Sequence, residues 1–339
     1  MKKINEIKKI VITGGGGYVG SKLVPFLIHR GYEVTVLDLF LYGKEVFKEI
    51  STHPNLYLVS GDIRNLNLLK KTFHNQDCLI HLACISNDPS FDLDPNLGKS
   101  INYDSFNGIL AAVNESSIQR LIYASSSSVY GVSSAPRVTE DTECNPLTDY
   151  SKYKLLCEDM LKNYHLKNCI YTIISPATVC GYAPRLRLDL TVNILTIQAL
   201  VNKKMTVFGG NQLRPHVFIN DIVEAYCLLI ESQEAKVASR TFNAGYENRS
   251  VSDTACIIKE QIQKMNPYNI NISVAKSNDH RSYHIDSSKI YNELGFKPQY
   301  DLYYAVQTLC KAFNEGLMEN PLENSLYYNI KRMKEVDLK

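Results

Sequence analysis

The fold is decided by the stretch Lys9-Ile10-Val11-Ile12-Thr13-Gly14-Gly15-Gly16-Gly17-Tyr18-Val19-Gly20. A short run rich in β-branched residues leads into a glycine-rich turn, and an apolar helical pattern follows at once. The glycines at 14, 17 and 20 give the spacing G-x-x-G-x-x-G between a strand and a helix. Gly14 permits the tight turn, Gly17 lets the backbone approach a pyrophosphate, and Gly20 lets the helix pack close to the strand. The alternative is a merely flexible loop.

An acidic residue at the expected distance favours dinucleotide binding over a flexible loop. The run Glu33–Asp38 is typical of a second strand, and Asp38 stands eighteen residues after Gly20. A carboxylate at this place binds ribose hydroxyls and repels a 2′-phosphate. The N-terminus of the first helix offers free N–H groups to phosphates. We therefore predict an NAD site, with NAD favoured over NADP.

The bulk composition is that of an ordinary globular enzyme. The 339 residues carry a formal net charge of +2, with 45% hydrophobic and 21% charged residues. This balance gives no reason to expect nucleic acid or a membrane surface as a partner. Nine cysteines, an odd number and never in C-x-x-C, argue against a disulfide framework or a metal site and for a reducing compartment. The N-terminus is too charged for a signal peptide and no apolar run approaches ~18 residues, so we expect a soluble cytoplasmic protein.

Apolar strand-like runs alternate with helical patterns over the first half of the chain. The later runs lie at 56–59, 78–83, 121–124 and 170–174. This alternation predicts an α/β fold with a doubly wound parallel Rossmann sheet. Beyond Pro176 the pattern loosens, which we interpret as a smaller C-terminal α/β substrate-binding cap. The predicted division is an NAD-binding Rossmann domain of residues 1–176, to which 215–243 return, and a cap of 177–214 and 244–339.

Polar residues follow several of these strands, at the sheet edge where ligands bind in open α/β folds. Asp62 follows the third strand and either meets an adenine amino group or caps the next helix. We interpret His81 as a packed core histidine rather than a catalyst. Ser86 and the serine run 125–128 follow two further strands, and there we favour a function over plain loops.

A tyrosine and a lysine four positions apart indicate hydride-transfer chemistry. Tyr150 and Lys154 share one helical face. A nearby ammonium favours the phenolate and lowers the pKa of the tyrosine. Tyr150 then removes a hydroxyl proton while a hydride passes to the nicotinamide, and Ser126 hydrogen-bonds the same oxygen. A Y-x-x-x-K spacing alone also arises by chance, as a pair of surface residues. The prediction of hydride transfer therefore rests on finding this spacing together with the cofactor pattern and the serine run.

Together these features resemble the extended short-chain dehydrogenase/reductase family, which includes the NAD-dependent nucleotide-sugar epimerases and dehydratases. The resemblance covers almost the whole chain. It rests on Thr13-Gly14-x-x-Gly17-x-x-Gly20, Asp38, Asp62-Ile63, His81-Leu82-Ala83, Asn102, Ser125-Ser126-x-x-Val129-Tyr130-Gly131, Tyr150-x-x-x-Lys154, Leu213-Arg214-Pro215-His216-Val217-Phe218-Ile219-Asn220-Asp221, Arg281-Ser282-Tyr283 and Leu294-Gly295-Phe296-x-Pro298.

The resemblance implies roles for individual residues. It makes Ser126 the catalytic serine, Tyr150 the base and Lys154 its partner and ribose ligand. The implied cofactor contacts are Gly14, Gly17, Tyr18, Val19, Asp38, Asp62, Ile63, Leu82, Ala83, Asn102, Tyr150, Lys154 and Pro176. The implied substrate contacts are Ser86, Ser127, Thr178, Arg187, Asn193, Arg214 and Arg281, and no metal is implied. Arg214 and Arg281 would hold a nucleotide diphosphate, since a guanidinium fork binds phosphate oxygens in pairs. The alternative for each arginine is a surface residue without a ligand.

Departures from the family pattern exclude some of the reactions that members of the family catalyse. Members that eliminate water or carbon dioxide carry an acid at one or both positions matching Ser127 and Ser128, and members that epimerise at C3 or C5 carry a cysteine at the second. Here both are serine, which leaves oxidation or reduction at C4. The stretch Thr178-Val179-Cys180-Gly181 also lacks the usual asparagine, so the substrate contacts near the phosphates differ from the family pattern.

The stretch Ala183-Pro184-Arg185-x-Arg187-x-Asp189-Leu190-x-Val192-Asn193 is similar to a subgroup from bacterial surface-polysaccharide gene sets. That subgroup includes GDP-heptose 4-dehydrogenases that keep NAD bound. Arg187 and Asn193 are its implied nucleotide contacts, or alternatively surface residues at a helix start.

We expect an NAD-dependent 4-epimerase or 4-dehydrogenase acting on a nucleotide-diphosphate sugar. The alternatives are a 4-ketoreductase of a deoxysugar and a non-catalytic NAD-binding regulator. The resemblance also implies a homodimer through helices near 98–116 and 148–165.

Overall fold

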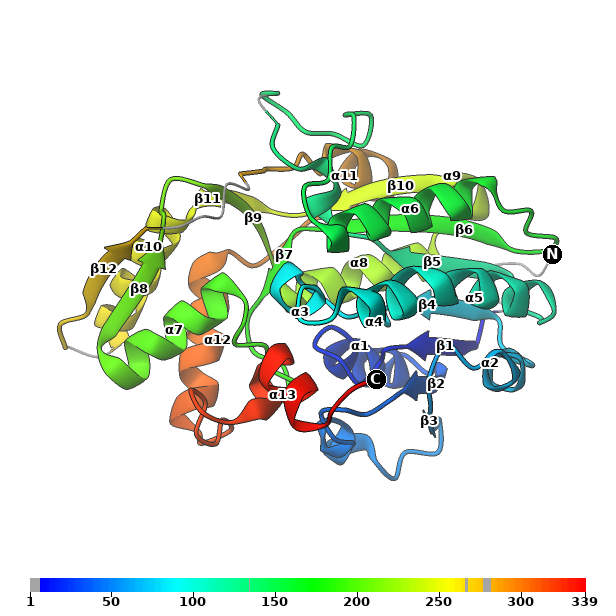
Figure 1. Ribbon diagram of the computed structural model, residues 1–339, viewed down its shortest axis with the longest axis horizontal. Helices are drawn as coiled ribbons and strands as arrows, with labels where there is room; N and C mark the ends of the chain where they lie inside the picture. Colours follow the sequence, from blue (N-terminus) through cyan, green and yellow to red (C-terminus); the bar gives the residue numbers. More distant parts are fainter. Residues whose placement is uncertain (1–6, 134, 266–267, 277–281) are drawn as a thin grey trace.

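A seven-stranded parallel sheet forms the centre of the computed structural model, which describes residues 7–133, 135–265, 268–276 and 282–339 (Figure 1). The strand order is β10-β6-β5-β4-β1-β2-β3, and each neighbouring pair is parallel. The strands are β1 (Lys9–Thr13), β2 (Glu33–Asp38), β3 (Leu56–Ser60), β4 (Cys78–His81), β5 (Arg120–Ala124), β6 (Ile170–Pro176) and β10 (Arg240–Ala244). This arrangement confirms the predicted doubly wound Rossmann sheet.

Helices cover both faces of this sheet, because side chains alternate along each strand. Ile10 and Ile12 of β1 pack in one cluster, which also holds Leu23 of α1, whereas Val11 packs in a second cluster with Phe106 of α5. The helices of this region are α1 (Gly20–His29), α2 (Leu66–Phe73), α3 (Asp88–Phe91), α4 (Pro95–Lys99), α5 (Ser105–Asn114), α6 (Asp149–Asn163), α8 (Ile219–Glu231), α9 (Glu234–Val237) and α11 (Ser288–Leu294). Shorter turns are 3₁₀ at Glu45–Ile50 and Ser127–Tyr130 and π-helical at Ser100–Asp104.

A smaller α/β region lies beyond the carboxyl ends of the strands, at the left of Figure 1. It holds a three-stranded sheet of order β11-β9-β7 and a two-stranded sheet of β12 and β8. Its elements are β7 (Thr178–Cys180), α7 (Thr191–Asn202), β8 (Lys204–Phe208), β9 (Leu213–Phe218), β11 (Glu247–Ser250), α10 (Val251–Met265), β12 (Asn271–Ala275) and α12 (Leu302–Asn314). The segment 219–244 returns to the large sheet as α8 and β10. The domain boundaries given above stay a prediction.

His81 is the packed core residue that the sequence predicts. It ends β4, is 3% exposed, and its Nδ1 lies 2.7 Å from the hydroxyl oxygen of Thr13. Its ring stacks against Phe106 and Tyr123, with centroids 5.5 Å and 5.9 Å away. Burial lowers the pKa of His81 to about 3, with a smaller effect from Lys154. The imidazole is therefore neutral and structural near neutral pH.

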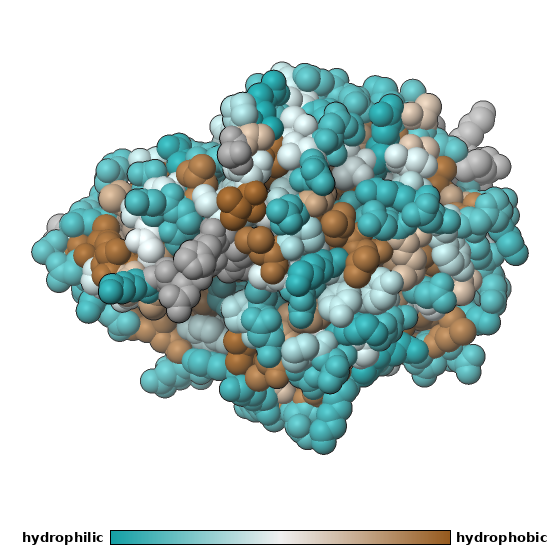
Figure 2. Space-filling view, turned by 45° about the horizontal axis from the view of Figure 1, so that its top comes forward, coloured by the Kyte–Doolittle hydropathy of each residue, from teal (hydrophilic) through white to brown (hydrophobic). Residues whose placement is uncertain are grey.

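The chain ends beside the carboxyl edge of the large sheet. A 3₁₀ turn (Ser325–Tyr327) leads into α13 (Asn329–Glu335), which contacts α3 (Figure 1). On the face shown in Figure 2 the hydrophobic residues form small separate patches among hydrophilic ones. Within the described ranges, every helix is too short or too polar to cross a bilayer.

Candidate active site

A cavity of about 400 Å³ opens where the carboxyl ends of the large sheet face the smaller region. Residues from both parts line it, from the glycine-rich turn after β1 to Arg214 on β9. Ligands in doubly wound folds bind at this edge of the sheet. The predicted site residues in its lining are Gly14, Gly17, Tyr18, Val19, Asp38, Asp62, Ile63, Leu82, Ala83, Ser86, Ser126, Tyr150, Lys154, Pro176, Thr178, Arg187 and Arg214.

The glycine-rich turn has the geometry that its spacing predicts. Gly14 has φ +73°, and a Cβ there would lie 2.5 Å from the backbone of Ala83 on the neighbouring chain segment. A Cβ at Gly20 would lie 2.2 Å from the carbonyl oxygen of Gly15, so this glycine allows the helix to start against the turn. At Gly17 a Cβ would meet only the carbonyl of Gly14, at 3.1 Å. The space beside Gly17 and the start of α1 is thus open for phosphates.

Asp38 ends β2 with its carboxylate held by the backbone. One oxygen accepts from the Gly16 amide at 2.9 Å and the other from the Phe40 amide at 2.7 Å. Burial raises the pKa of Asp38, and these two hydrogen bonds oppose the rise. Each carboxylate oxygen can accept further hydrogen bonds. The group is fixed in position and still has acceptor capacity for ribose hydroxyls.

Asp62 lies in the cavity lining but is also paired with a neighbouring arginine. Its carboxylate accepts from Arg64, at 2.6 Å to Nη2. Burial would raise the pKa of Asp62, but the hydrogen bonds from Arg64 lower it on balance. Asp62 is not the N-cap of the next helix, because that place belongs to Asn65, whose side chain accepts from the Leu68 amide at 3.1 Å.

Three residues with the predicted catalytic side chains come together on the cavity wall. Thr148 caps α6, which places Tyr150 and Lys154 in the first turns of that helix. Ser126 precedes the 3₁₀ turn, and its hydroxyl lies 2.9 Å from that of Ser128. Lys154 is 4% exposed, donates to the Ala124 carbonyl at 2.7 Å, and has its Nζ 5.9 Å from the centre of the Tyr150 ring.

The ionisation of Tyr150 differs from the expectation. Burial raises the pKa of Tyr150 above its usual value, with a further rise from Cys84. The opposing influences are the charge of Arg187 and a hydrogen bond from Ser126. The expected net lowering of the pKa of Tyr150 is therefore not seen, because the burial of the phenol outweighs the nearby charges.

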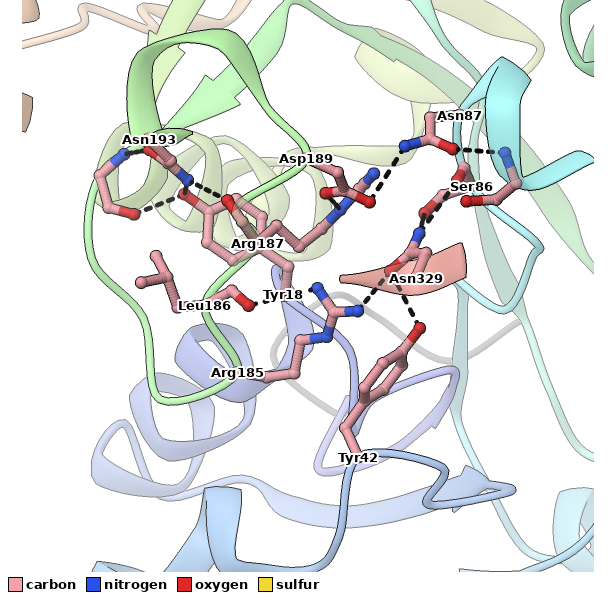
Figure 3. A network of polar contacts seen from close by, with 12 residues as sticks. Tyr18, Tyr42, Ser86, Asn87, Arg185, Leu186, Arg187, Asp189, Asn193 and Asn329 are labelled. Atoms are coloured by element: carbon pink, nitrogen blue, oxygen red, sulfur yellow. Dashed lines mark hydrogen bonds and ion pairs between the residues drawn. The ribbon is translucent and has the colours of Figure 1, made fainter. Parts of the chain in front are cut away.

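Two arginines are buried in the middle of the cavity wall (Figure 3). Arg187 forms an ion pair with Asp189 at 2.9 Å, and Arg185 lies with its guanidinium carbon 3.7 Å from the centre of the Tyr42 ring. Burial alone would lower the pKa of Arg187, but Asp189 raises it on balance, so the guanidinium stays charged. Nη2 of Arg187 and Nε of Arg185 are buried without a hydrogen-bond partner among the described residues. Buried unpaired donors of this kind point to an anionic ligand.

Three predicted contacts lie behind the cavity wall, and a fourth lies outside the described residues. The Asn102 amide is used by the backbone of Ile85, with bonds of 2.8 Å and 2.9 Å, so it holds the turn after β4. Ser127 is 2% exposed and turns away from the cavity, which Ser126 and Ser128 line. The Asn193 side chain bonds Gly181, Tyr18 and the Arg187 carbonyl (Figure 3), so it supports the wall instead of lining it. Arg281 is the residue outside the described ranges.

Some cavity residues escape sequence reasoning altogether. Asn329, Met333 and Leu338 come from the last fifteen residues, and Tyr42 comes from the loop after β2. Their stretches carry no motif that would mark them. Arg185 and Asp189 also line the cavity, and they stand in the same short stretch as the predicted Arg187. The alternation of charged and apolar residues at 185–189 was the available signal for these two.

Comparison with known proteins identifies the class. A family profile described as "NAD dependent epimerase/dehydratase family" matches residues 10–245. The chain is 27% identical over 317 residues to the UDP-glucose 4-epimerase of Lactobacillus helveticus, covering 86% of this chain and 93% of that protein. It is 30% identical over 264 residues to a putative UDP-glucose 4-epimerase of Methanocaldococcus jannaschii, covering 75% and 82%. The protein therefore belongs to the NAD-dependent epimerase/dehydratase family.

Solved structures agree with this placement. The UDP-glucuronic acid 4-epimerase from Bacillus cereus, in complex with UDP-glucuronic acid and NAD, superposes with a TM-score of 0.81 at 25% identity, covering 91% of this chain and 99% of that one. The dTDP-glucose 4,6-dehydratase DesIV from Streptomyces venezuelae has the same fold, with a TM-score of 0.82 at 20% identity over 93% and 99%.

The cavity fits the cofactor of the family, which is NAD. The glycine at 17 leaves room beside a helix N-terminus, and Asp38 presents a fixed carboxylate one strand away. Together they match a pyrophosphate and an adjacent ribose. The protein is an NAD-dependent enzyme.

Proposed function

We propose that the protein oxidises or reduces C4 of a nucleotide-diphosphate sugar, as a 4-epimerase or a 4-dehydrogenase. The observation that carries this proposal is the meeting of Ser126, Tyr150 and Lys154 in the same cavity as Asp38 and the glycine-rich turn. Oxidation at C4 removes a proton from the hydroxyl oxygen and a hydride from the carbon, so a base and a hydride acceptor must both lie beside C4. Relatives named as nucleotide-sugar 4-epimerases support the choice of substrate class.

Tyr150 is the proposed base. In its phenolate form, the Tyr150 oxygen takes the proton of the sugar 4-hydroxyl, while Ser126 donates a hydrogen bond to the same sugar oxygen. When bound, NAD would supply the hydride acceptor for this carbon. The oxidised nicotinamide carries a positive charge, which would favour the Tyr150 phenolate against the effect of burial. Lys154 places a second cation near the Tyr150 ring, with its Nζ 5.9 Å from the ring centre.

The diphosphate is the proposed partner of the buried arginines. Arg187 carries a charged guanidinium with an unpaired nitrogen at the cavity wall. Arg214 on β9 lies in the same lining, with its guanidinium carbon 5.3 Å from the centre of the Tyr283 ring. Guanidinium groups that line one cavity can hold phosphate oxygens in pairs. Ser86 and Thr178 supply further polar groups in the lining.

The acids of the cavity argue against elimination of water. The aspartates in the described lining are Asp38, Asp62, Asp88 and Asp189. Asp38 is held by backbone amides, Asp62 by Arg64 and Asp189 by Arg187. Asp88 accepts a hydrogen bond from Thr148, the cap of α6. Each carboxylate is thus engaged in a structural role, and the positions beside Ser126 are serines.

Three wider expectations also stay proposals. We propose a role in bacterial surface-polysaccharide synthesis, because the stretch 183–193 resembles that subgroup. We propose a homodimer through α5 and α6; Leu156 on α6 is 42% exposed and would be covered by a partner. We propose a cytoplasmic location from the cysteine content and composition.

Incubation of the purified holoenzyme with UDP-, dTDP- and GDP-linked sugars tests the reaction. The account predicts transient or lasting reduction of bound NAD with at least one of them, and a product that is the C4 epimer or the 4-keto sugar. A product lighter by one water would contradict the reaction type. NAD binding without turnover of any sugar nucleotide would favour the non-catalytic regulator, and obligatory release of oxidised cofactor after reduction of a 4-keto sugar would favour the ketoreductase.

A further inference from the structure

The last fifteen residues of the chain form a wall of the cofactor cavity. Residues 325–339, which we call the C-terminal segment, include α13 and run across the carboxyl edge of the large sheet (Figure 1). Asn329, Met333 and Leu338 of this segment line the same cavity as Asp38 and Asp62. The segment therefore reaches the part of the cavity where the adenosine half of NAD is expected.

Asn329 is the centre of its attachment (Figure 3). This side chain is 4% exposed, and its carbonyl oxygen accepts from the Tyr42 hydroxyl at 2.9 Å and from the Arg185 guanidinium. Its NH₂ group donates to the carbonyl and to the hydroxyl of Ser86, at 3.0 Å and 3.1 Å. An amide has two donors and two acceptor sites. All of them are used, by residues from three different loops, which follow β2, β4 and β7.

Two apolar side chains add to the attachment. Met333 is 5% exposed and belongs to the apolar cluster that contains Ile63 and Ile101, and Leu338 packs against the same cluster. Ile63 and Ile101 also line the cavity. Burying side chains of this size removes apolar area from water and stabilises the packing of the segment against the cavity.

Polar bonds fix the segment at two further places. Arg332 donates from Nε to the carbonyl of Leu41, in the loop after β2, at 2.5 Å. The carbonyl oxygen of Lys339 accepts from Arg64 at 2.7 Å, and the same arginine pairs with Asp62. The segment is thus tied to the loops that follow β2, β3 and β4, which are the loops expected to surround the adenosine.

We propose that the C-terminal segment closes the adenosine end of the NAD site, so that the cofactor leaves only when this segment detaches. Detachment breaks the four bonds of Asn329 and exposes Met333, whereas Arg214, the proposed substrate contact, belongs to β9 and not to this segment. NAD is then retained through successive turnovers, while substrate and product exchange freely. This inference rests on NAD binding in the cavity and is independent of which sugar reacts.

The test is the rate at which bound NAD exchanges. The holoenzyme is loaded with NAD labelled in the adenine ring and chased with a large excess of unlabelled NAD. We compare the wild type with Asn329→Ala and with Lys334→Ala, an exposed position on the same helix. The wild type and Lys334→Ala should release label at the same slow rate. Asn329→Ala should release it roughly tenfold faster or more, since buried partners are left unpaired.

A second variant separates release from misfolding. Arg332→Ala removes the bond to Leu41 at a residue outside the cavity lining, and it should also accelerate release while thermal unfolding stays close to that of the wild type. Equal release from the wild type, Asn329→Ala and Arg332→Ala, all folded, would overturn the proposal, as would slower release from the variants. The readout needs no sugar, so failure of the proposed reaction leaves the release rates interpretable.

Discussion

The ammonium group of Lys154 donates a hydrogen bond of 2.7 Å to the carbonyl oxygen of Ala124, at the end of strand β5. The lysine that a Y-x-x-x-K pattern assigns to the tyrosine is thus hydrogen-bonded to the sheet, and its Nζ lies 5.9 Å from the centre of the Tyr150 ring. Arg187 and Ser126 are the groups that oppose the effect of burial on Tyr150. We therefore expect the ionisation of Tyr150 to depend on the charges that bind beside it.

This relationship predicts how the pKa of Tyr150 responds to cofactor. In the NAD-free protein the phenol should stay protonated beyond pH ~10, because burial disfavours the phenolate. Oxidised NAD should lower this pKa through its positive charge, and reduced NAD should lower it less. Ultraviolet difference titrations of the wild type against Tyr150→Phe measure the phenolate directly. A pKa that is the same with and without oxidised NAD would contradict this interpretation.

Asp38 should decide between NAD and NADP. Its fixed carboxylate accepts from ribose hydroxyls and repels a 2′-phosphate, so NAD should bind more tightly than NADP. Asp38→Ala should weaken NAD binding by roughly ten- to a hundredfold and reduce the preference. Calorimetric titration of both cofactors checks this, with Asp253→Ala on the exposed side of α10 as the matched control. An unchanged preference in Asp38→Ala would exclude this role.

The serine run offers a matched pair of variants. Ser128 lines the cavity, accepts from Ser151 at 2.8 Å and lies 2.9 Å from Ser126, whereas Ser127 is buried away from the cavity. Ser128→Ala should slow NAD reduction in a single turnover by roughly tenfold, because Ser126 loses the partner that orients it. Ser127→Ala should leave the rate nearly unchanged. The reverse order of effects would mean that Ser127, the residue favoured by sequence, is the one that contacts substrate.

His81 should make the fold sensitive to acid. Its pKa is about 3 in the folded protein against an ordinary 6.5, so the unfolded chain binds a proton first as the pH falls. Stability from the neutral imidazole is complete above pH 6.5 and is lost progressively down to about pH 3, by up to ~1.4 kcal/mol per pH unit. His81→Asn should show a flatter decline of the unfolding temperature over this window.

The decline in His81→Asn should be reduced rather than abolished. His216, 2% exposed, has its pKa lowered to about 4, also mainly by burial, and still titrates in the variant. Thermal unfolding curves at several pH values give both slopes. Identical slopes for the wild type and His81→Asn would show that His81 does not carry the effect.

The sequence predicts the parts of the site that depend on local geometry. A turn that needs Gly14 at positive φ, an acid at the end of β2 and a tyrosine one helical turn before a lysine are visible as spacings. Asn102, Ser127 and Asn193 do not line the cavity, because a motif gives a position on an element and not the direction of the side chain. Asn329 could not be found, since it meets Tyr42 across 287 positions and its partners are fixed only by the tertiary fold.

The central claim is that Tyr150 removes the proton as hydride passes to NAD. The most direct measurement is the single-turnover rate of NAD reduction by a sugar nucleotide that the wild type oxidises, compared with Tyr150→Phe loaded with the same cofactor. The account predicts a loss of ~10²–10⁴-fold in this rate. NAD and the sugar nucleotide should remain bound, because Asp38 and the arginines are unchanged. A near-normal rate of NAD reduction in Tyr150→Phe would contradict it and would place the base elsewhere in the cavity.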